Sequence, residues 1–140
     1  MWFYLVALER EVGVDVEDVD RPGETVEIAD QFFSPTEVAA LRAVPVAAQR
    51  YRFFQYWTLK ESYIKARGMG LSIPLDQFSF QLEANQPIRI TFDPRLNDDP
   101  GRWQFAQFRL TPRHLTAAAI PRGPDPDLTI QLRQTVPLVY

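Results

Sequence analysis

The chain has 140 residues, of which 46% are hydrophobic and 24% are charged, so it has enough apolar material for the core of one soluble globular domain. Its net charge of -3 argues against general nucleic-acid binding, because proteins that bind nucleic acids usually carry an excess of basic residues. The absence of cysteine excludes disulfides, thiolate catalysis and zinc–thiolate sites.

The N-terminal segment, MWFYLVALEREVGVDVEDV (residues 1–19), contains two β-rich runs on either side of EREVG and predicts a β-hairpin. Its longest apolar run, WFYLVAL, is too short to span a membrane. No basic segment precedes that run, so a signal peptide is not expected. We therefore expect a cytoplasmic protein without a membrane partner, folded as a single domain over residues 1–140.

Two helices are predicted after a polar connection and a short amphipathic piece. The first begins in SPTEVAALRAV, where Ser34 can be the N-cap, Pro35 takes the first helical position and Glu37 completes a capping box. This helix stops before the next proline. The second helix is long, from about residue 47 to 67, and glycines end it.

The remainder of the chain reads as antiparallel strands. The segment LSIPLDQFSF is a loop that runs into a strand, and further strands are predicted in PIRITF, WQFAQFRL, HLTAAAI and LTIQL. Clusters of Pro, Gly, Asn and Asp separate them. The order of hairpin, two helices and antiparallel strands predicts the α+β class.

Two carboxylates share one face of the second hairpin strand, VGVDVE (residues 12–17). Because strand side chains alternate, we expect the valines to point into the core, with Asp15 and Glu17 on the other face beside Gly13. The two acids are then about 7 Å apart. Mg²⁺ is the cation that such a pair suits, since it prefers one or two carboxylates completed by water and phosphate. The alternative is a solvated acidic face that leads into a turn.

The long helix carries a Lys-Glu pair and a second lysine next to a tryptophan. Glu61 lies one turn after Trp57 and one turn before Lys65. The simple interpretation is a surface Glu–Lys pair, worth only about 0.3–0.5 kcal/mol. The alternative is an anion site, because residues 49–67 contain five basic side chains and one acidic side chain, a local charge of +4.

Three motifs in this order resemble the 4′-phosphopantetheinyl transferases of the surfactin-synthetase-activating type. These are VGVDVE, FFSPTE and WTLKESYIKARGMGLSIPL, and the resemblance covers about residues 4–80, followed by a compatible β tail. The resemblance implies the fold of that family. It also implies holo-carrier-protein synthase activity, in which the phosphopantetheine arm of coenzyme A is moved to a serine of an acyl or peptidyl carrier protein.

The resemblance also implies roles for particular residues. Asp15, Glu17 and Glu61 would hold Mg²⁺ against the diphosphate of coenzyme A. Lys65 would contact the phosphates, Lys60 would support the phosphate or pantetheine end, and Trp57 would pack beneath the site. Glu37 matches a glutamate proposed in the family as the general base for the carrier serine. The capping box explains Glu37 independently, and both roles can hold together.

The chain departs from that family type in one respect. The type has two similar halves with coenzyme A between them, and this chain resembles the second half, without the first half and its basic residues for the 3′-phosphate. We therefore expect weak binding of coenzyme A, little transfer by a monomer, and self-association or pairing with a missing half. Two rival hypotheses remain: a non-catalytic fragment that binds coenzyme A or a carrier protein, and an unrelated Mg²⁺-dependent phosphotransfer enzyme.

Overall fold

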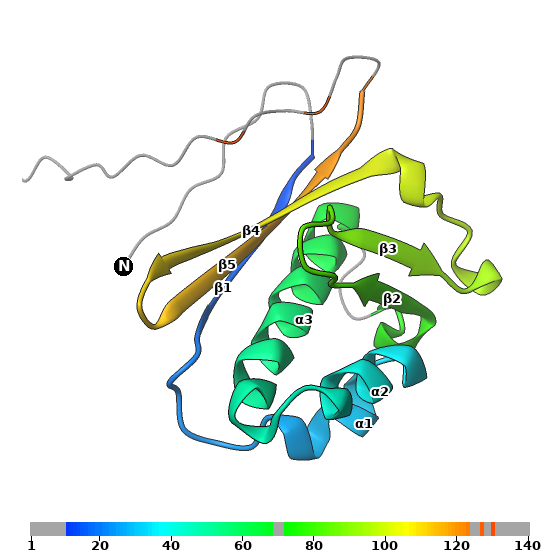
Figure 1. The fold of residues 1–140 in the computed structure, drawn as a ribbon. Coiled ribbons are helices and arrows are strands. Elements are labelled where there is room, and N and C mark those ends of the chain that lie inside the picture. Colours follow the sequence, from blue (N-terminus) through cyan, green and yellow to red (C-terminus); the bar gives the residue numbers. More distant parts are fainter. Residues whose placement is uncertain (1–10, 69–71, 124–126, 128–129, 131–140) are drawn as a thin grey trace, which may run out of the picture.

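The computed structural model describes residues 11–68, 72–123, 127 and 130. They form a three-stranded antiparallel sheet, a long helix on one face of that sheet, and a small layer on the far side of the helix (Figure 1). The sheet has the strand order β1-β5-β4, with β1 spanning Gly13–Asp18, β4 Trp103–Thr111 and β5 His114–Pro121. This arrangement places the acidic strand β1 at an edge of the sheet.

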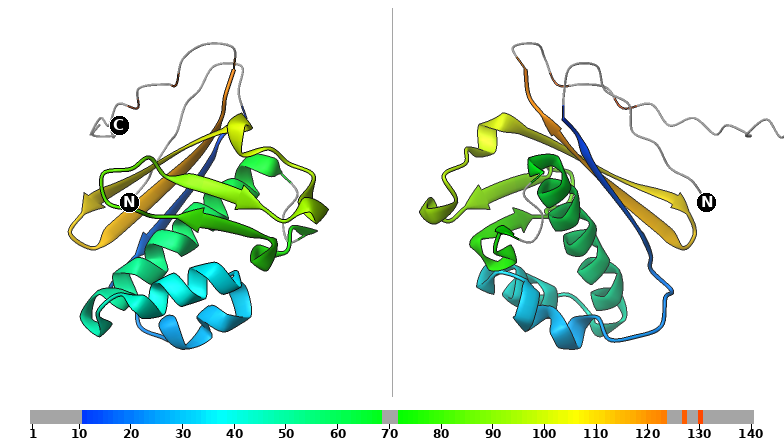
Figure 2. Two further views of the ribbon diagram at one scale, coloured as in Figure 1. Left: turned by 45° about the vertical axis from the view of Figure 1, so that its right-hand side comes forward. Right: turned by 180° about the vertical axis from the view of Figure 1, so that it is seen from behind.

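The long helix α3, Val46–Arg67, is the centre of the molecule. It packs against β1 and β5 on one side and against α2 and β2 on the other, and Figure 2 shows the same layers from two further directions. Its core face is aromatic, with Phe53, Phe54 and Tyr63 fully buried. Gly68 ends the helix in the left-handed conformation (φ 65°), in agreement with the predicted glycine stop.

The small layer contains two short helices and a β-hairpin. A 3₁₀ turn (η1, Val26–Ile28) leads into α1, Ala29–Phe32, and α2 follows over Pro35–Ala43. The hairpin pairs β2, Phe78–Gln81, with β3, Arg89–Phe92. Within the described connections, 3₁₀ turns also lie at Leu75–Gln77, Pro94–Leu96 and Pro100–Arg102.

Most predicted elements are confirmed. The helix predicted from Ser34 has the full capping box, and the second helix begins one residue earlier than expected. Four of the five predicted C-terminal strand segments contain β2, β3, β4 and β5. The first run of the N-terminal hairpin and nearly all of the strand predicted in LTIQL lie outside the described residues.

The predicted orientation of β1 is wrong. Gly13 and Asp15 are buried against α3, whereas Val14 and Val16 are half-buried on the outer face of the sheet. The cause is the absence of a side chain at Gly13, where a Cβ would lie 2.5 Å from the backbone nitrogen of Ala66. A helix backbone can approach a strand this closely only over a glycine, so the glycine face is the one that packs on α3.

Candidate active site

The acidic residues of the sequence motif meet α3 where it crosses the edge strand. Strand β1 and helix α3 pack face to face, and Lys65 near the end of the helix contacts Asp15 near the start of the strand. Further along β1, Glu17 contacts Trp57, which lies two turns earlier on α3. Strand and helix therefore run in opposite directions along this contact, with Trp57, Glu61 and Lys65 spaced at intervals of one helical turn.

Asp15 is the most buried of the three predicted metal ligands. Its Oδ1 accepts a hydrogen bond from Lys65 Nζ at 2.8 Å, while its Oδ2 is buried without a hydrogen-bond partner. Burial raises the pKa of Asp15 to about 6; Lys65 opposes this shift, and the negative charges of Glu17 and Glu61 add to it. The hydrogen bond and charge of Lys65 therefore do not fully offset the effect of burial on the pKa of this carboxyl group.

Glu17 is held by two donors. The indole N–H of Trp57 donates to its Oε1 at 3.1 Å, and Arg21 lies on its Oε2 at 3.2 Å. The tryptophan ring itself is fixed by an edge contact with Phe32 and by stacking on Phe53. Trp57 thus supports, through this hydrogen bond, the cluster of Asp15, Glu17 and Glu61, which we call the acidic site. Arg21 also contacts this site, and the sequence motifs do not contain it.

Glu61 completes the group from the helix side. Burial raises the pKa of its carboxyl group, with Lys65 opposing the shift and Glu17 adding to it. The three carboxylates are therefore close enough to influence one another electrostatically, whereas their sharing of one Mg²⁺ stays a prediction. Among the described residues, however, no three acidic, histidine or cysteine side chains are gathered as the ligands of a metal ion.

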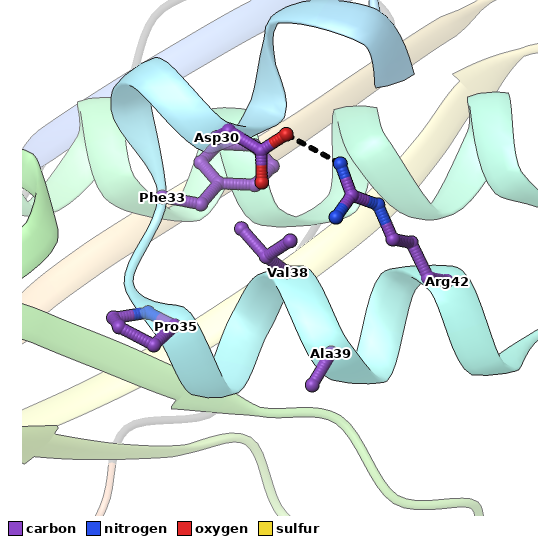
Figure 3. Close-up of a pocket in the computed structure, with 6 residues that line it drawn as sticks. All are labelled: Asp30, Phe33, Pro35, Val38, Ala39 and Arg42. Atoms are coloured by element: carbon purple, nitrogen blue, oxygen red, sulfur yellow. Dashed lines mark hydrogen bonds and ion pairs between the residues drawn. The ribbon is translucent and has the colours of Figure 1, made fainter.

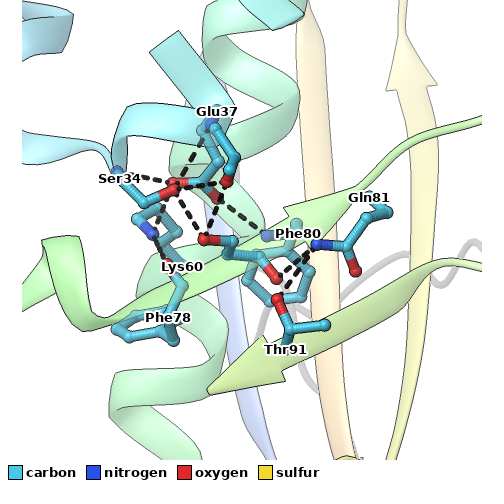
Figure 4. Close-up of polar contacts among 9 residues, drawn as sticks. Ser34, Glu37, Lys60, Phe78, Phe80, Gln81 and Thr91 are labelled. Atoms are coloured by element: carbon cyan, nitrogen blue, oxygen red, sulfur yellow. Dashed lines mark hydrogen bonds and ion pairs between the residues drawn. The ribbon is translucent and has the colours of Figure 1, made fainter. Parts of the chain in front are cut away.

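Glu37 and Lys60 form a separate, buried ion pair, which Figure 4 shows together with its neighbours. Glu37 Oε1 lies 2.7 Å from Lys60 Nζ and also accepts the backbone N–H of Ser34, and its Oε2 accepts the N–H of Phe80 at 2.9 Å. Lys60 Nζ donates to the carbonyl oxygen of Phe78 at 2.6 Å and lies over the ring of Phe78.

These contacts confirm the cap at Glu37 and change the expectation for Lys60. The ammonium group of Lys60 is buried in the core, so the predicted contact with a phosphate or with pantetheine is not available to it in this structure. The base role of Glu37 stays a prediction, since both of its oxygens are engaged in links between α2, α3 and β2.

The positive charge of α3 is largely structural. Arg50 donates to the carbonyl oxygens of the loop after β1, Arg52 donates to that of Leu82, and Arg67 pairs with the buried carboxylate of Asp98. The local charge of +4 therefore overestimates the number of basic side chains on this helix that are available to bind an anion. Lys65, with a half-exposed side chain, is the lysine that reaches the acidic site.

A cavity of about 330 Å³ opens beside Glu61. Its walls come from α1, α3 and the segment after α3, and they combine apolar side chains such as Phe32 and Ile64 with polar ones such as Asp76. A second hollow of about 390 Å³ lies between α1 and α2, where Arg42 pairs with Asp30 across the surface (Figure 3). The first cavity is the one that borders a predicted site residue.

A comparison with protein families decides what kind of protein carries this site. The family model of the 4'-phosphopantetheinyl transferase superfamily matches residues 11–120. The chain belongs to this superfamily. The match includes every residue to which a site role was assigned, from Asp15 to Lys65, and it removes the rival hypothesis of an unrelated phosphotransfer enzyme.

Curated members of the superfamily are similar in sequence. A 4'-phosphopantetheinyl transferase of Bacillus subtilis is 40% identical over 89 residues, which are 64% of this chain and 39% of the relative. The L-aminoadipate-semialdehyde dehydrogenase-phosphopantetheinyl transferase of Xenopus laevis is 29% identical over 125 residues, with coverage of 80% and 40%. The chain thus spans about two fifths of the length of the curated relatives it matches.

Solved transferase structures share the fold. The holo-[acyl-carrier-protein] synthase of Thermotoga maritima aligns with a TM-score of 0.61 at 22% identity, over 79% of this chain and 62% of the other. The synthase of Helicobacter pylori, solved in complex with coenzyme A, aligns with a TM-score of 0.59 at 14% identity, over 79% and 99%. These similarities confirm the predicted α+β transferase fold.

Proposed function

We propose that this chain provides the catalytic site of a 4′-phosphopantetheinyl transferase, which transfers 4′-phosphopantetheine from coenzyme A to a serine of an acyl or peptidyl carrier protein. The observation that carries the proposal is the junction of β1 and α3. There, a chain of this superfamily brings Asp15, Glu17, Glu61 and Lys65 to one place next to a cavity.

The residues fit a divalent cation in their chemistry. Asp15 Oδ2 is a buried oxygen with no hydrogen-bond partner, and burial raises the pKa of Asp15 to about 6 despite the neighbouring lysine. A hard cation with oxygen ligands, as Mg²⁺ is, would satisfy that oxygen. Asp15, Glu17 and Glu61 would hold it, and when bound it would neutralise charge on the diphosphate.

In the proposed reaction, the serine oxygen of the carrier protein forms a bond to the phosphorus that bears the pantetheine arm. The bond from this phosphorus to the bridging oxygen breaks, and the nucleotide part of coenzyme A leaves as a phosphate. Lys65 stabilises the negative charge that grows on the leaving side, because its ammonium group stands at the acidic site and is half-exposed. The serine proton passes to a carboxylate, for which Glu37 stays the predicted base.

The cavity beside Glu61 would supply room for the reacting groups next to the acidic side chains. Among the residues that the structure describes, none of the helices has the length and hydropathy needed to span a membrane. A cytoplasmic location of the chain stays part of the proposal.

The proposal is tested by incubating the chain with coenzyme A, an apo carrier protein and Mg²⁺ over a range of chain concentrations. Mass spectrometry then measures the 4′-phosphopantetheine adduct on the carrier protein. We expect transfer that rises with chain concentration and that falls at least about 100-fold in Glu61→Gln, as is typical when a group that stabilises the transition state is removed. The control is Glu83→Gln, which changes an exposed glutamate on the far hairpin.

The rival hypothesis, a non-catalytic fragment, predicts a different result in the same experiment. Such a fragment would bind coenzyme A or the carrier protein in calorimetry without forming an adduct at any concentration. Absence of both binding and transfer would contradict the proposed function altogether.

A further inference from the structure

Two positively charged side chains already occupy the acidic site. Lys65 Nζ lies 2.8 Å from Asp15 Oδ1, and Arg21 Nη1 lies 3.2 Å from Glu17 Oε2. The side chains of Asp15 and Glu17 are 8% and 17% exposed, whereas those of Lys65 and Arg21 are 49% and 42% exposed. The acids are therefore held by the fold, and the two cations reach them from the solvent side.

The acids also keep binding capacity that these cations do not use. Asp15 Oδ2 is buried and has no hydrogen-bond partner, and Glu17 Oε1 is oriented by the indole N–H of Trp57. A carboxylate oxygen buried without a partner is costly unless a ligand satisfies it. This observation, which is independent of the two ion pairs, indicates that the site is built for an additional cation.

The backbone that carries Arg21 is fixed, although its guanidinium group is half-exposed. Arg50 on α3 donates to the carbonyl oxygens of Val19 and Arg21 and lies 3.4 Å from that of Gly23, so it holds the loop that follows β1. The guanidinium group of Arg21 lies over the ring of Phe54, with its central carbon 5.1 Å from the ring centre. Arg21 can therefore change its charged partner by side-chain rotation, without movement of the loop.

The charged side chains at the acidic site both attract and repel a divalent cation that enters it. Three carboxylates carry three negative charges, and Lys65 and Arg21 carry two positive charges that a metal ion would repel at short range. A diphosphate bound with the metal ion offers the lysine and the arginine new anionic partners. The guanidinium group of arginine suits phosphate oxygens particularly well, because its donors form a planar fork.

We propose that Arg21 and Lys65 are resident counter-ions of the acidic site, and that they move to diphosphate oxygens when a divalent cation takes their place on Asp15 and Glu17. The metal ion and the diphosphate of coenzyme A then bind cooperatively. Arg21 becomes a positioning residue for the diphosphate. This inference rests on the proposed function, because it assumes that the acidic site takes a metal ion together with coenzyme A.

The experiment measures metal binding directly, with Mn²⁺ as the probe and the free ion quantified by electron paramagnetic resonance. The full chain is titrated with Mn²⁺ in the absence and in the presence of coenzyme A. Coupling between two ligands is commonly about 5- to 150-fold in affinity, and we expect coenzyme A to strengthen Mn²⁺ binding by a factor in this range.

Two variants then separate counter-ion exchange from a structural role. In Arg21→Gln and in Lys65→Gln, we expect Mn²⁺ alone to bind more tightly than in the original chain, because a competing positive charge is gone. The strengthening by coenzyme A should become smaller in both. The matched control is Arg113→Gln, which removes an exposed arginine from Asp18 on the same strand and should change neither quantity.

Each outcome of these titrations has a distinct meaning. Equal Mn²⁺ affinity with and without coenzyme A in the original chain would overturn the inference and leave the metal site of the proposed function intact. Weaker binding of Mn²⁺ alone in Arg21→Gln and Lys65→Gln would also overturn it, since that result identifies the two cations as supports of the site. Absence of Mn²⁺ binding under both conditions would overturn the metal site and the inference together.

Discussion

At the scale of single residues, the two lysines of the chain illustrate how burial assigns a role. Lys60 and Lys65 both belong to the motif WTLKESYIKARG, yet Lys60 lies in the core against Glu37 and Lys65 lies at the acidic site. Burial lowers the pKa of Lys60, and the charge and hydrogen bond of Glu37 oppose this shift. The charge of Lys60 therefore depends on its partner Glu37.

This dependence gives a prediction for Glu37→Gln. Glutamine can keep the cap on Ser34 but leaves the buried ammonium group of Lys60 without an anion, so we expect a loss of about 3–5 kcal/mol in the free energy of unfolding. The double variant Glu37→Gln/Lys60→Met should recover much of that loss, because both charges are then absent. Urea unfolding followed by circular dichroism measures all three proteins.

The same variants test the base role of Glu37, when transfer to a carrier protein is measured alongside stability. Abolished transfer in the double variant Glu37→Gln/Lys60→Met, whose stability is expected to recover, would favour the base role. Reduced stability with surviving transfer would mean that Glu37 acts only as a cap and as the partner of Lys60.

At the scale of elements, the packing of β1 on α3 creates the site. Gly13 allows the close approach, and the residues that alternate with the valines are thereby turned toward the helix. We predict that Gly13→Ala loses about 1–3 kcal/mol of stability, because its Cβ would collide with the backbone of Ser62 and Ala66. A shift of β1 would also separate Asp15 from Lys65.

Thermal unfolding and Mn²⁺ titration measure these two effects of Gly13→Ala. The matched control is Gly101→Ala, where the nearest atom to an added Cβ is Asp99 Oδ1 at 3.4 Å and a small effect is expected. If Gly13→Ala is as stable as this control, the close strand–helix contact is not what orients β1.

The same elements mark the limit of prediction from sequence. Helix α2 was predictable because its signals, Ser34, Pro35 and Glu37, act within one turn. The buried face of β1 was not predictable, because an alternating strand has two possible faces. The valines favour burial of their own face, whereas in the structure the face with Gly13 and Asp15 is the buried one. Arg21 was missed because the i,i+4 spacing to Glu17 brings side chains together on a helix, whereas here it runs from strand β1 into a loop that Arg50 holds from α3.

At the scale of the whole molecule, the orientation of β1 turns Val14 and Val16, both half-buried, to the outer face of the sheet, away from α3. The register aligns Val14 with Ala118 and Ala106, and Val16 with Thr116 and Phe108, so these two rows of neighbouring residues carry no charge. An ion pair between Asp18 and Arg113 lies at the end of this face. An apolar centre with charge at its margin is typical of an interaction surface.

We predict that the chain self-associates through this outer face, most simply as a two-fold dimer. Val16→Asp should then shift the mass in solution toward the monomer, because it places a charge at the centre of the contact. Val46→Asp is the matched control, since Val46 is 83% exposed at the start of α3 and not on the sheet. Sedimentation equilibrium measures both, and a monomeric original chain at all concentrations would contradict the prediction.

The contrast between Lys60 and Lys65 has a practical consequence for chemical labelling. The sequence contains two lysines, and the burial of Lys60 shields its amine from reagents in solution. An acylating probe directed at lysine side chains will therefore modify the ε-amine of Lys65 before that of Lys60. A fluorophore attached in this way lies next to the acidic site, so its emission changes when a ligand binds there.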